Sequence, residues 1–204
     1  MRIAVVGGTG DFGANLAARL VEAEQDVVVG SRDAERAQAA AAKIGARGAT
    51  NAEAVDGADL VVLAVKAEAA LSTASELADA INVPVLSVAS ALRFTKAGVF
   101  PSDDEVSLAE RTQELLSAPV VAGLHSLAAA TLAAGKADGD ALVCGDDADA
   151  KQVALEVASL VVTGRALDAG PLASARALEG LTAVIVNLNK RYRAHAGVRV
   201  TGLP

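Results

Sequence analysis

Short apolar runs alternate with amphipathic, alanine-rich segments along the first half of this 204-residue chain. The runs are rich in valine, which indicates strands, and lie at 3–8, 26–31, 58–66 and 83–90. The segments between them repeat apolar side chains at helical spacing and lie at 11–24, 34–45 and 70–81. Apolar strands that alternate with helices are typical of a parallel sheet covered on both faces. The pattern therefore predicts an α/β fold, a doubly wound parallel Rossmann sheet.

The second half of the chain has a different pattern of expected elements. Residues 93–105 contain glycine, proline and three consecutive acids, which predicts a surface loop near the mouth of the sheet. Further elements are expected as helices at 106–117, 148–162 and 173–193 and as strands at 119–126, 140–145 and 164–168. We therefore expect a Rossmann domain at 1–118 and a small α+β C-terminal lobe at 119–204.

A glycine-rich turn follows the first expected strand. Gly8, Thr9, Gly10, Asp11, Phe12 and Gly13 fit the G-x-G-x-x-G pattern, here between a strand and a helix. In that context Gly8 is expected to permit the tight turn, Gly10 to admit a diphosphate and Gly13 to let the helix approach the strand. The free amides and positive end of the helix would bind the diphosphate.

The end of the second expected strand lacks the carboxylate that usually holds the ribose of NAD. Ser31 and Arg32 stand there instead, and Arg36 lies one helical turn further on. A hydroxyl and two guanidinium groups suit a 2′-phosphate, which predicts NADP. Two charge-assisted contacts of about 1.5–3 kcal/mol each would favour NADP by on the order of a hundredfold. Asp33 is expected to cap the next helix; a solvated charged turn is the alternative interpretation.

Composition limits the other classes of function. A net charge of −7 argues against a nucleic-acid or anionic-membrane binder, and no apolar run has the length of a membrane span. Apolar residues make up 52% of the chain, enough for a substantial core. The single cysteine, Cys144, rules out an internal disulfide and a cysteine-cluster zinc site, so no metal is expected and a cytoplasmic location is favoured.

Several stretches together resemble the NADPH-dependent reductases of coenzyme F420. They are VVGGTGDFGANLAARL, VVVGSR, VVAGLHSLAAATL, VCGDD and LDAGPLASARALEGLTAVIVNLNKRYRAHAG, which span nearly the whole chain. The resemblance implies reversible hydride transfer between NADP(H) and the deazaflavin F420, a homodimer, and a C-terminal lobe that helps to cover the deazaflavin.

The resemblance also implies a set of binding residues. Those for NADP are Thr9, Gly10, Asp11 and Phe12 at the diphosphate, Ser31, Arg32 and Arg36 at the 2′-phosphate, and Val65 and Ala129 near the nicotinamide. Those for the deazaflavin are Ser90, Leu92, His125 and Leu203. Lys66 stands where some relatives carry proline, and a contact with a phosphate or carboxamide is expected for it.

The sequence leaves two kinds of alternative open. The chain could be an NADPH-dependent reductase of another acceptor, such as a flavin or ferric chelate, or an NADP-sensing protein without chemistry. His125 is a candidate catalytic proton donor or ring contact, and a structural histidine is an equal alternative.

Overall fold

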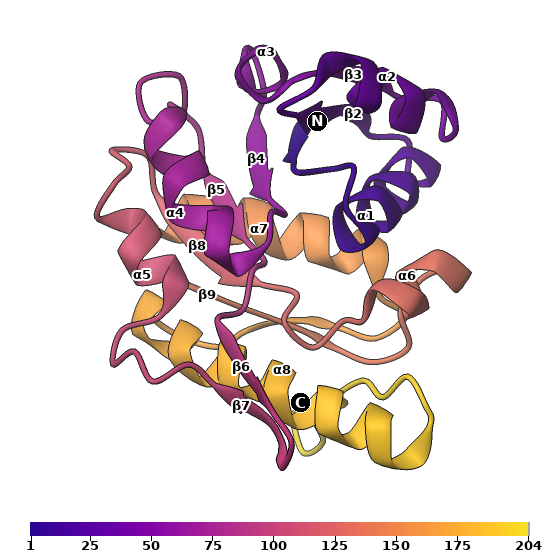
Figure 1. The fold of residues 1–204 in the computed structure, drawn as a ribbon, viewed down its shortest axis with the longest axis vertical. Helices are drawn as coiled ribbons and strands as arrows, with labels where there is room; N and C mark the ends of the chain where they lie inside the picture. The colour runs from indigo at the N-terminus through magenta and orange to yellow at the C-terminus, as the bar shows by residue number, and fades with distance from the viewer. Residues whose placement is uncertain (204) are drawn as a thin grey trace.

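The computed structural model of the chain describes residues 1–203 (Figure 1). The strands are β1 (Arg2–Val6), β2 (Asp26–Ser31), β3 (Arg47–Thr50), β4 (Leu60–Leu63), β5 (Val85–Ser87), β6 (Leu92–Thr95), β7 (Gly98–Pro101), β8 (Val120–Gly123), β9 (Ala141–Gly145) and β10 (Ala166–Asp168). The helices are α1 (Asp11–Glu22), α2 (Ala34–Ala42), α3 (Asn51–Val55), α4 (Ala67–Glu76), α5 (Leu108–Gln113), α6 (Ala129–Ala134), α7 (Ala148–Val161) and α8 (Ala175–Tyr192), with a 3₁₀ turn at Leu172–Ser174.

Eight of the strands form one sheet in the order β10-β9-β8-β5-β4-β1-β2-β3. All neighbouring pairs are parallel except β8 with β9. The strand order reverses at β1, which pairs with β2 on one side and β4 on the other. In open α/β sheets ligands bind at such a switch point, outside the carboxyl ends of the strands. The predicted doubly wound parallel sheet is confirmed.

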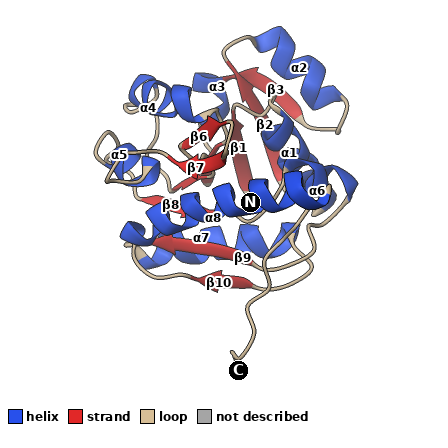
Figure 2. Cartoon of the chain, turned by 60° about the horizontal axis from the view of Figure 1, so that its bottom comes forward, coloured by secondary structure: helices blue, strands red, loops and turns tan. Residues whose placement is uncertain are grey.

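The two faces of the sheet carry separate apolar clusters because side chains alternate along each strand. Ile3 and Val5 of β1 pack with α1, α2, α6 and α7 on one face. Ala4 and Val6 pack with α3, α4, α5 and α8 on the other. Figure 2 shows the strands enclosed between these helices. The sheet is therefore buried on both sides, as continuous apolar strands require.

The sheet continues through the position of the expected domain boundary. β8 pairs with β5, and β9 and β10 extend the same sheet beyond it. Residues 119–203 thus add an antiparallel edge and α8 to the sheet. The division at residue 118 stays a prediction.

The expected surface loop at 93–105 is instead partly an antiparallel hairpin, β6–β7. It lies along α8 (Figure 1), where the side-chain amide of Asn187 accepts from the N–H of Val99 at 2.9 Å and donates to its carbonyl at 2.7 Å. The acids that suggested a loop follow the hairpin, so the prediction was wrong only for its two strands. The short elements β3, α3 and α6 were not expected.

Residues after α8 return along the start of β9. The buried carboxylate of Asp140 accepts from the N–H groups of Arg165 and Val200, both at 2.8 Å. The N–H of Asp140 donates to the carbonyl of Val198 at 2.6 Å. The C-terminal segment is thus held against β9 and β10. Across residues 1–203, no helix combines the length and the apolar character needed to cross a membrane.

Candidate functional site

The glycine turn joins β1 to α1 with very little space around its backbone. Gly7 has a φ of 79°, and the N–H groups of Gly7 and Gly8 both donate to the carbonyl of Gly30, at 3.1 and 3.0 Å. The positive φ belongs to Gly7, so the expectation that Gly8 permits the turn is corrected. A Cβ on Gly8 would instead lie 2.8 Å from the carbonyl oxygen of Val5. Gly8 is required by close packing.

Gly13 has the role expected for the third glycine of the pattern. A Cβ there would lie 2.8 Å from the carbonyl oxygen of Gly7 and 2.9 Å from the Cα of Gly8. The first turn of α1 therefore sits directly on the glycine turn. The N–H groups of Asp11, Phe12 and Gly13 have no partner within the helix, which leaves them available to an anion.

A cavity of about 570 Å³ opens beside this turn. It is lined by Gly7, Thr9, Gly10, Ser31, Arg32, Asp33, Arg36, Asn51, Ala64, Val65, Lys66, Glu68, Ala69 and Thr73. These residues come from the glycine turn, the carboxyl end of β2, α2, α3, the segment after β4 and α4. The cavity thus lies at the switch point of the sheet, and we call it the dinucleotide cavity. Its shape and donors fit a dinucleotide.

The end of β2 supplies positive charge to the dinucleotide cavity. Within residues 1–203, neither guanidinium of Arg32 and Arg36 makes a hydrogen bond or an ion pair. Asp33 accepts from the N–H of Arg36 at 3.2 Å and is the N-cap of α2, as expected. Ser31 accepts from the N–H of Asp33 at 3.3 Å, and its hydroxyl proton stays available. These groups fit a bound phosphate.

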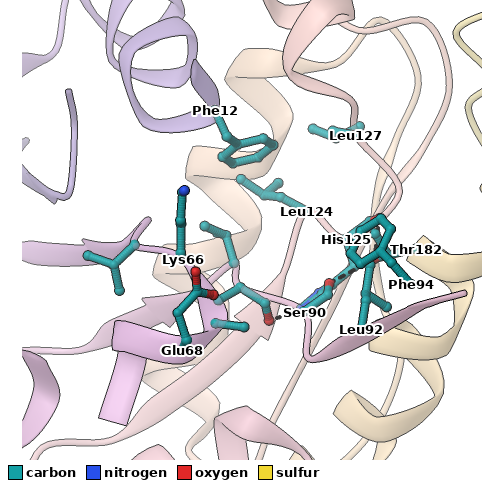
Figure 3. Close-up of a pocket in the computed structure, with 14 residues that line it drawn as sticks. Phe12, Lys66, Glu68, Ser90, Leu92, Phe94, Leu124, His125, Leu127 and Thr182 are labelled. Carbon is teal, nitrogen blue, oxygen red and sulfur yellow. Dashed lines mark hydrogen bonds between the residues drawn. The ribbon is translucent and has the colours of Figure 1, made fainter. Parts of the chain in front are cut away.

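A second cavity of about 540 Å³ adjoins the first (Figure 3). Its lining comprises Phe12, Val65, Lys66, Ala67, Glu68, Val88, Ala89, Ser90, Leu92, Phe94, Leu124, His125, Leu127 and Thr182. Val65, Lys66 and Glu68 line both cavities, so the two spaces meet at the start of α4. Aliphatic side chains and Phe12 dominate the second cavity, which fits a flat ring. We call it the ring cavity.

A short chain of hydrogen bonds crosses one wall of the ring cavity. The hydroxyls of Ser90 and Thr182 lie 2.9 Å apart, and the Thr182 hydroxyl donates to the carbonyl of His125 at 2.9 Å. Ser90 follows β5, His125 follows β8 and Thr182 belongs to α8. Helix α8 therefore ties together two loops at the carboxyl edge of the sheet.

His125 is buried, and the low polarity around it controls its charge. Its Nε2 lies 3.3 Å from the carbonyl oxygen of Ala89, which can only accept, so Nε2 carries the proton. Burial lowers the pKa of His125 to about 4, while the Ala89 contact opposes that shift. The imidazole is thus neutral at pH 7 with its one N–H in use, which argues against the expected proton-donor role.

Most predicted site residues lie around the two cavities, but five do not line them: Gly8, Asp11, Gly13, Ala129 and Leu203. Ala129 begins α6 and its carbonyl accepts from the side chain of Asn15 at 3.1 Å. Leu203 is 50% exposed on the C-terminal segment. Gly8 is buried under the turn, and Asp11 is exposed at the start of α1. Roles for Ala129 and Leu203 stay predictions.

The sequence did not single out several residues that line the cavities. Gly7 was readable as the first of a glycine pair, but Asn51, Glu68 and Thr182 carried no signal. Asn51 lies in α3, which was not expected, and its Oδ1 is buried without a partner in residues 1–203. Thr182 is one polar position on an amphipathic helix. In the described part of the chain, no group of three or more His, Cys, Asp or Glu side chains could hold a metal ion.

Comparisons with known proteins agree on one family. A family model described as "NADP oxidoreductase coenzyme F420-dependent" matches residues 2–91. An F420-dependent NADP reductase from Methanothermobacter thermautotrophicus is 38% identical over an alignment covering all of this chain and 96% of that protein. Another from Methanocaldococcus jannaschii is 32% identical, covering all of this chain and 99% of its own. This chain belongs to the F420-dependent NADP reductase family.

A solved structure shares the architecture of this family member from end to end. It is described as a candidate F420-dependent NADP reductase from Arthrobacter sp. FB24, with 28% identity and a TM-score of 0.79 over 99% of each chain. The antiparallel edge and α8 are therefore part of the fold that the two proteins share. The cavities described above lie within that common fold.

Proposed function

We propose that this member of the F420-dependent NADP reductase family transfers hydride reversibly between NADP(H) and the deazaflavin coenzyme F420. The observation that carries the proposal is the meeting of the dinucleotide and ring cavities at Val65, Lys66 and Glu68. A hydride passes directly only between rings held in contact, so two adjoining cavities suit such a reaction.

On the dinucleotide side, the proposed contacts are those of the glycine turn and the end of β2. The first-turn amides of α1 would hold the diphosphate, and Ser31, Arg32 and Arg36 would hold the 2′-phosphate. What supports this assignment is that both guanidinium groups are exposed and lie without a partner in residues 1–203. The nicotinamide would then reach Val65 at the junction.

On the acceptor side, the proposed contacts are Ser90, Leu92 and His125. With both ligands bound, NADPH would supply a hydride to the deazaflavin ring, and a ring nitrogen would take a proton from solvent. Phe12, Leu124 and Leu127 would exclude water from the junction, which strengthens every electrostatic interaction there. The ammonium of Lys66 would stabilise negative charge that develops on the acceptor.

We also propose an oligomeric state and a cellular compartment for the protein. Helix α8 exposes Val184, Leu188 and Tyr192 at 54%, 40% and 68%, one helical turn apart, which suits an interface in a homodimer. A reaction that uses NADP(H) also needs a compartment that holds this cofactor, which favours the cytoplasm.

The test is anaerobic mixing of the protein with oxidised F420 and NADPH. The visible absorption of the deazaflavin is expected to disappear on addition of NADPH and to return with excess NADP⁺. Riboflavin and a ferric chelate at equal concentration serve as competing acceptors. Tight NADPH binding without loss of the deazaflavin band would contradict the proposal, and faster reduction of another acceptor would reassign the substrate.

A further inference from the structure

The Ser90–Thr182 pair lies in the wall of the ring cavity (Figure 3), and the other contacts of Thr182 decide which of the two hydroxyls donates. A threonine hydroxyl has one proton to donate. The Thr182 oxygen lies 2.9 Å from the carbonyl of His125 and 3.5 Å from that of Leu178. Both of these groups can only accept, so the single proton of Thr182 is directed to a carbonyl.

If Thr182 donated to Ser90 instead, the carbonyl of His125 would lose the proton that Thr182 donates to it. His125 is 4% exposed, and a buried carbonyl without a donor is strongly disfavoured. Because Thr182 donates to it, the contact of 2.9 Å between the two hydroxyls requires Ser90 to be the donor in that pair. The hydroxyl proton of Ser90 is therefore used in the hydrogen bond to Thr182, and the Ser90 oxygen retains a lone pair.

Ser90 is half-buried and lines the ring cavity, so that lone pair is available to a ligand. We infer that Thr182 is a positioning residue that sets Ser90 as a hydrogen-bond acceptor, which selects a ring bearing an N–H group such as a cyclic imide. The inference rests on the proposed function, because the pyrimidine ring of a deazaflavin carries an imide N–H between two carbonyls.

Ser90 suits the role of hydrogen-bond acceptor for a ring N–H better than the other polar groups of the ring cavity. Lys66 is a donor and suits a carbonyl, whereas the exposed carboxylate of Glu68 lies at the junction of the cavities. Nδ1 of His125 is an acceptor but is buried without a partner in residues 1–203, beyond the reach of water. Ser90 therefore combines an acceptor with access to the cavity.

The test compares 8-hydroxy-5-deazaflavin with its derivative methylated at the imide nitrogen. Dissociation constants are measured by fluorescence titration of the protein saturated with NADP⁺, and NADPH affinity is measured separately. The wild-type protein is expected to bind the methylated ring about tenfold more weakly, the factor expected for loss of one hydrogen bond. Ser90→Ala is expected to lose about tenfold for the unmethylated ring and nothing for the methylated one. Thr182→Val keeps the Ser90 oxygen but frees its proton, so it is expected to lose less than Ser90→Ala for the unmethylated ring and nothing for the methylated one.

Two further variants separate positioning from structural damage. Thr182→Ser keeps the hydroxyl and is expected to behave as the wild type. The double variant Ser90→Ala, Thr182→Val is expected to bind as weakly as Ser90→Ala alone, because Thr182 acts on the ring only through Ser90. Thermal unfolding midpoints verify that each variant is folded.

Several outcomes would overturn the inference. Equal loss of affinity for both rings would mean that Thr182 only maintains the cavity's shape. If the Ser90→Ala and Thr182→Val variants also lost affinity for NADPH, Ser90 would contact the nicotinamide carboxamide rather than the deazaflavin. Turnover with no discrimination between the rings would overturn the inference and keep the proposed function, whereas NADPH binding without any deazaflavin binding would overturn both.

Discussion

The buried carboxylate of Glu179 accepts a hydrogen bond of 2.7 Å from the backbone N–H of Leu108. Its other oxygen accepts from the N–H of Ala91 at 3.4 Å, and the residue is 1% exposed. Glu179 and Thr182 lie one turn apart on α8, and they contact Ala91 and Ser90, in the loop just before β6. The wall of the ring cavity is therefore anchored to α8 at two points.

Replacement of Glu179 tests this anchoring. Glu179→Ala leaves the buried N–H of Leu108 and the half-buried N–H of Ala91 without an acceptor and is expected to lower the free energy of unfolding by about 3 kcal/mol. Glu179→Gln retains one acceptor and is expected to lose about half as much. Urea unfolding measures both. Glu114→Gln, an exposed position after α5, is the control and is expected to stay within about 0.5 kcal/mol of the wild type. An equally stable Glu179→Ala variant would contradict the anchoring role.

The sequence predicted the parts of the fold that depend on local pattern. Continuous valine-rich strands that alternate with helices indicate a parallel sheet covered on both faces, and the glycine turn between the first strand and a helix is typical of the doubly wound form. Asp33 was readable as a helix cap from its place before an alanine-rich run. The phosphate-binding residues could be proposed for the same reason, since Ser31 and Arg32 directly follow a strand.

The ring cavity could not be predicted in this way because its walls come from distant segments. Ser90 and Thr182 are 92 positions apart and meet only because α8 packs on the β5 and β8 loops. The hairpin β6–β7 was missed since charged and turn-forming residues surround its short strands. Its position depends on Asn187 of α8, a contact that no local pattern encodes.

Cofactor preference should depend on the two arginines at the end of β2. Arg32→Ala, Arg36→Ala is expected to lower the ratio of kcat/KM for NADPH over NADH by on the order of a hundredfold, because NADH lacks the 2′-phosphate that these side chains are proposed to hold. Steady-state kinetics with both donors measures the ratio. Arg47→Ala removes an exposed arginine that pairs with Asp26 at 3.0 Å and should leave the ratio unchanged. An unchanged ratio in the double variant would place the phosphate elsewhere.

Two glycines of the turn should respond differently to alanine. A Cβ on Gly10 would lie 3.5 Å from the Gly7 oxygen, and Gly10 has a φ of −80°, so the free protein is expected to tolerate Gly10→Ala. Gly10 faces the dinucleotide cavity, so NADPH affinity should nevertheless fall at least tenfold by steric exclusion.

Gly13→Ala is expected to affect stability first. Its Cβ would meet backbone at 2.8 and 2.9 Å, which forces α1 away from the turn and is expected to cost about 2 kcal/mol. Urea unfolding and calorimetric titration with NADPH separate the two effects. Loss of stability in Gly10→Ala, or none in Gly13→Ala, would contradict the assigned roles.

The low pKa of His125 predicts a pH-dependent loss of stability. The unfolded protein binds a proton near pH 6.5, but the folded protein resists it until about pH 4. The contribution is therefore fully present above pH 6.5 and is lost as the pH falls towards 4, a change on the order of 3 kcal/mol. Urea unfolding at several pH values should show this extra slope in the wild type and not in His125→Gln. Parallel curves for the two proteins would mean that folding leaves the pKa of His125 unchanged.

The exposed stripe of α8 offers a test of the proposed homodimer. Leu188→Asp places a charge between Val184 and Tyr192, where an interface would have to bury it, so the variant is expected to sediment as a monomer. Leu115→Asp is the matched control because Leu115 is also 40% exposed but lies beyond α5, away from the stripe. If Leu188→Asp sediments with the mass of the wild-type dimer, this face of α8 lies outside the interface. A wild-type protein that sediments as a monomer would contradict the homodimer itself.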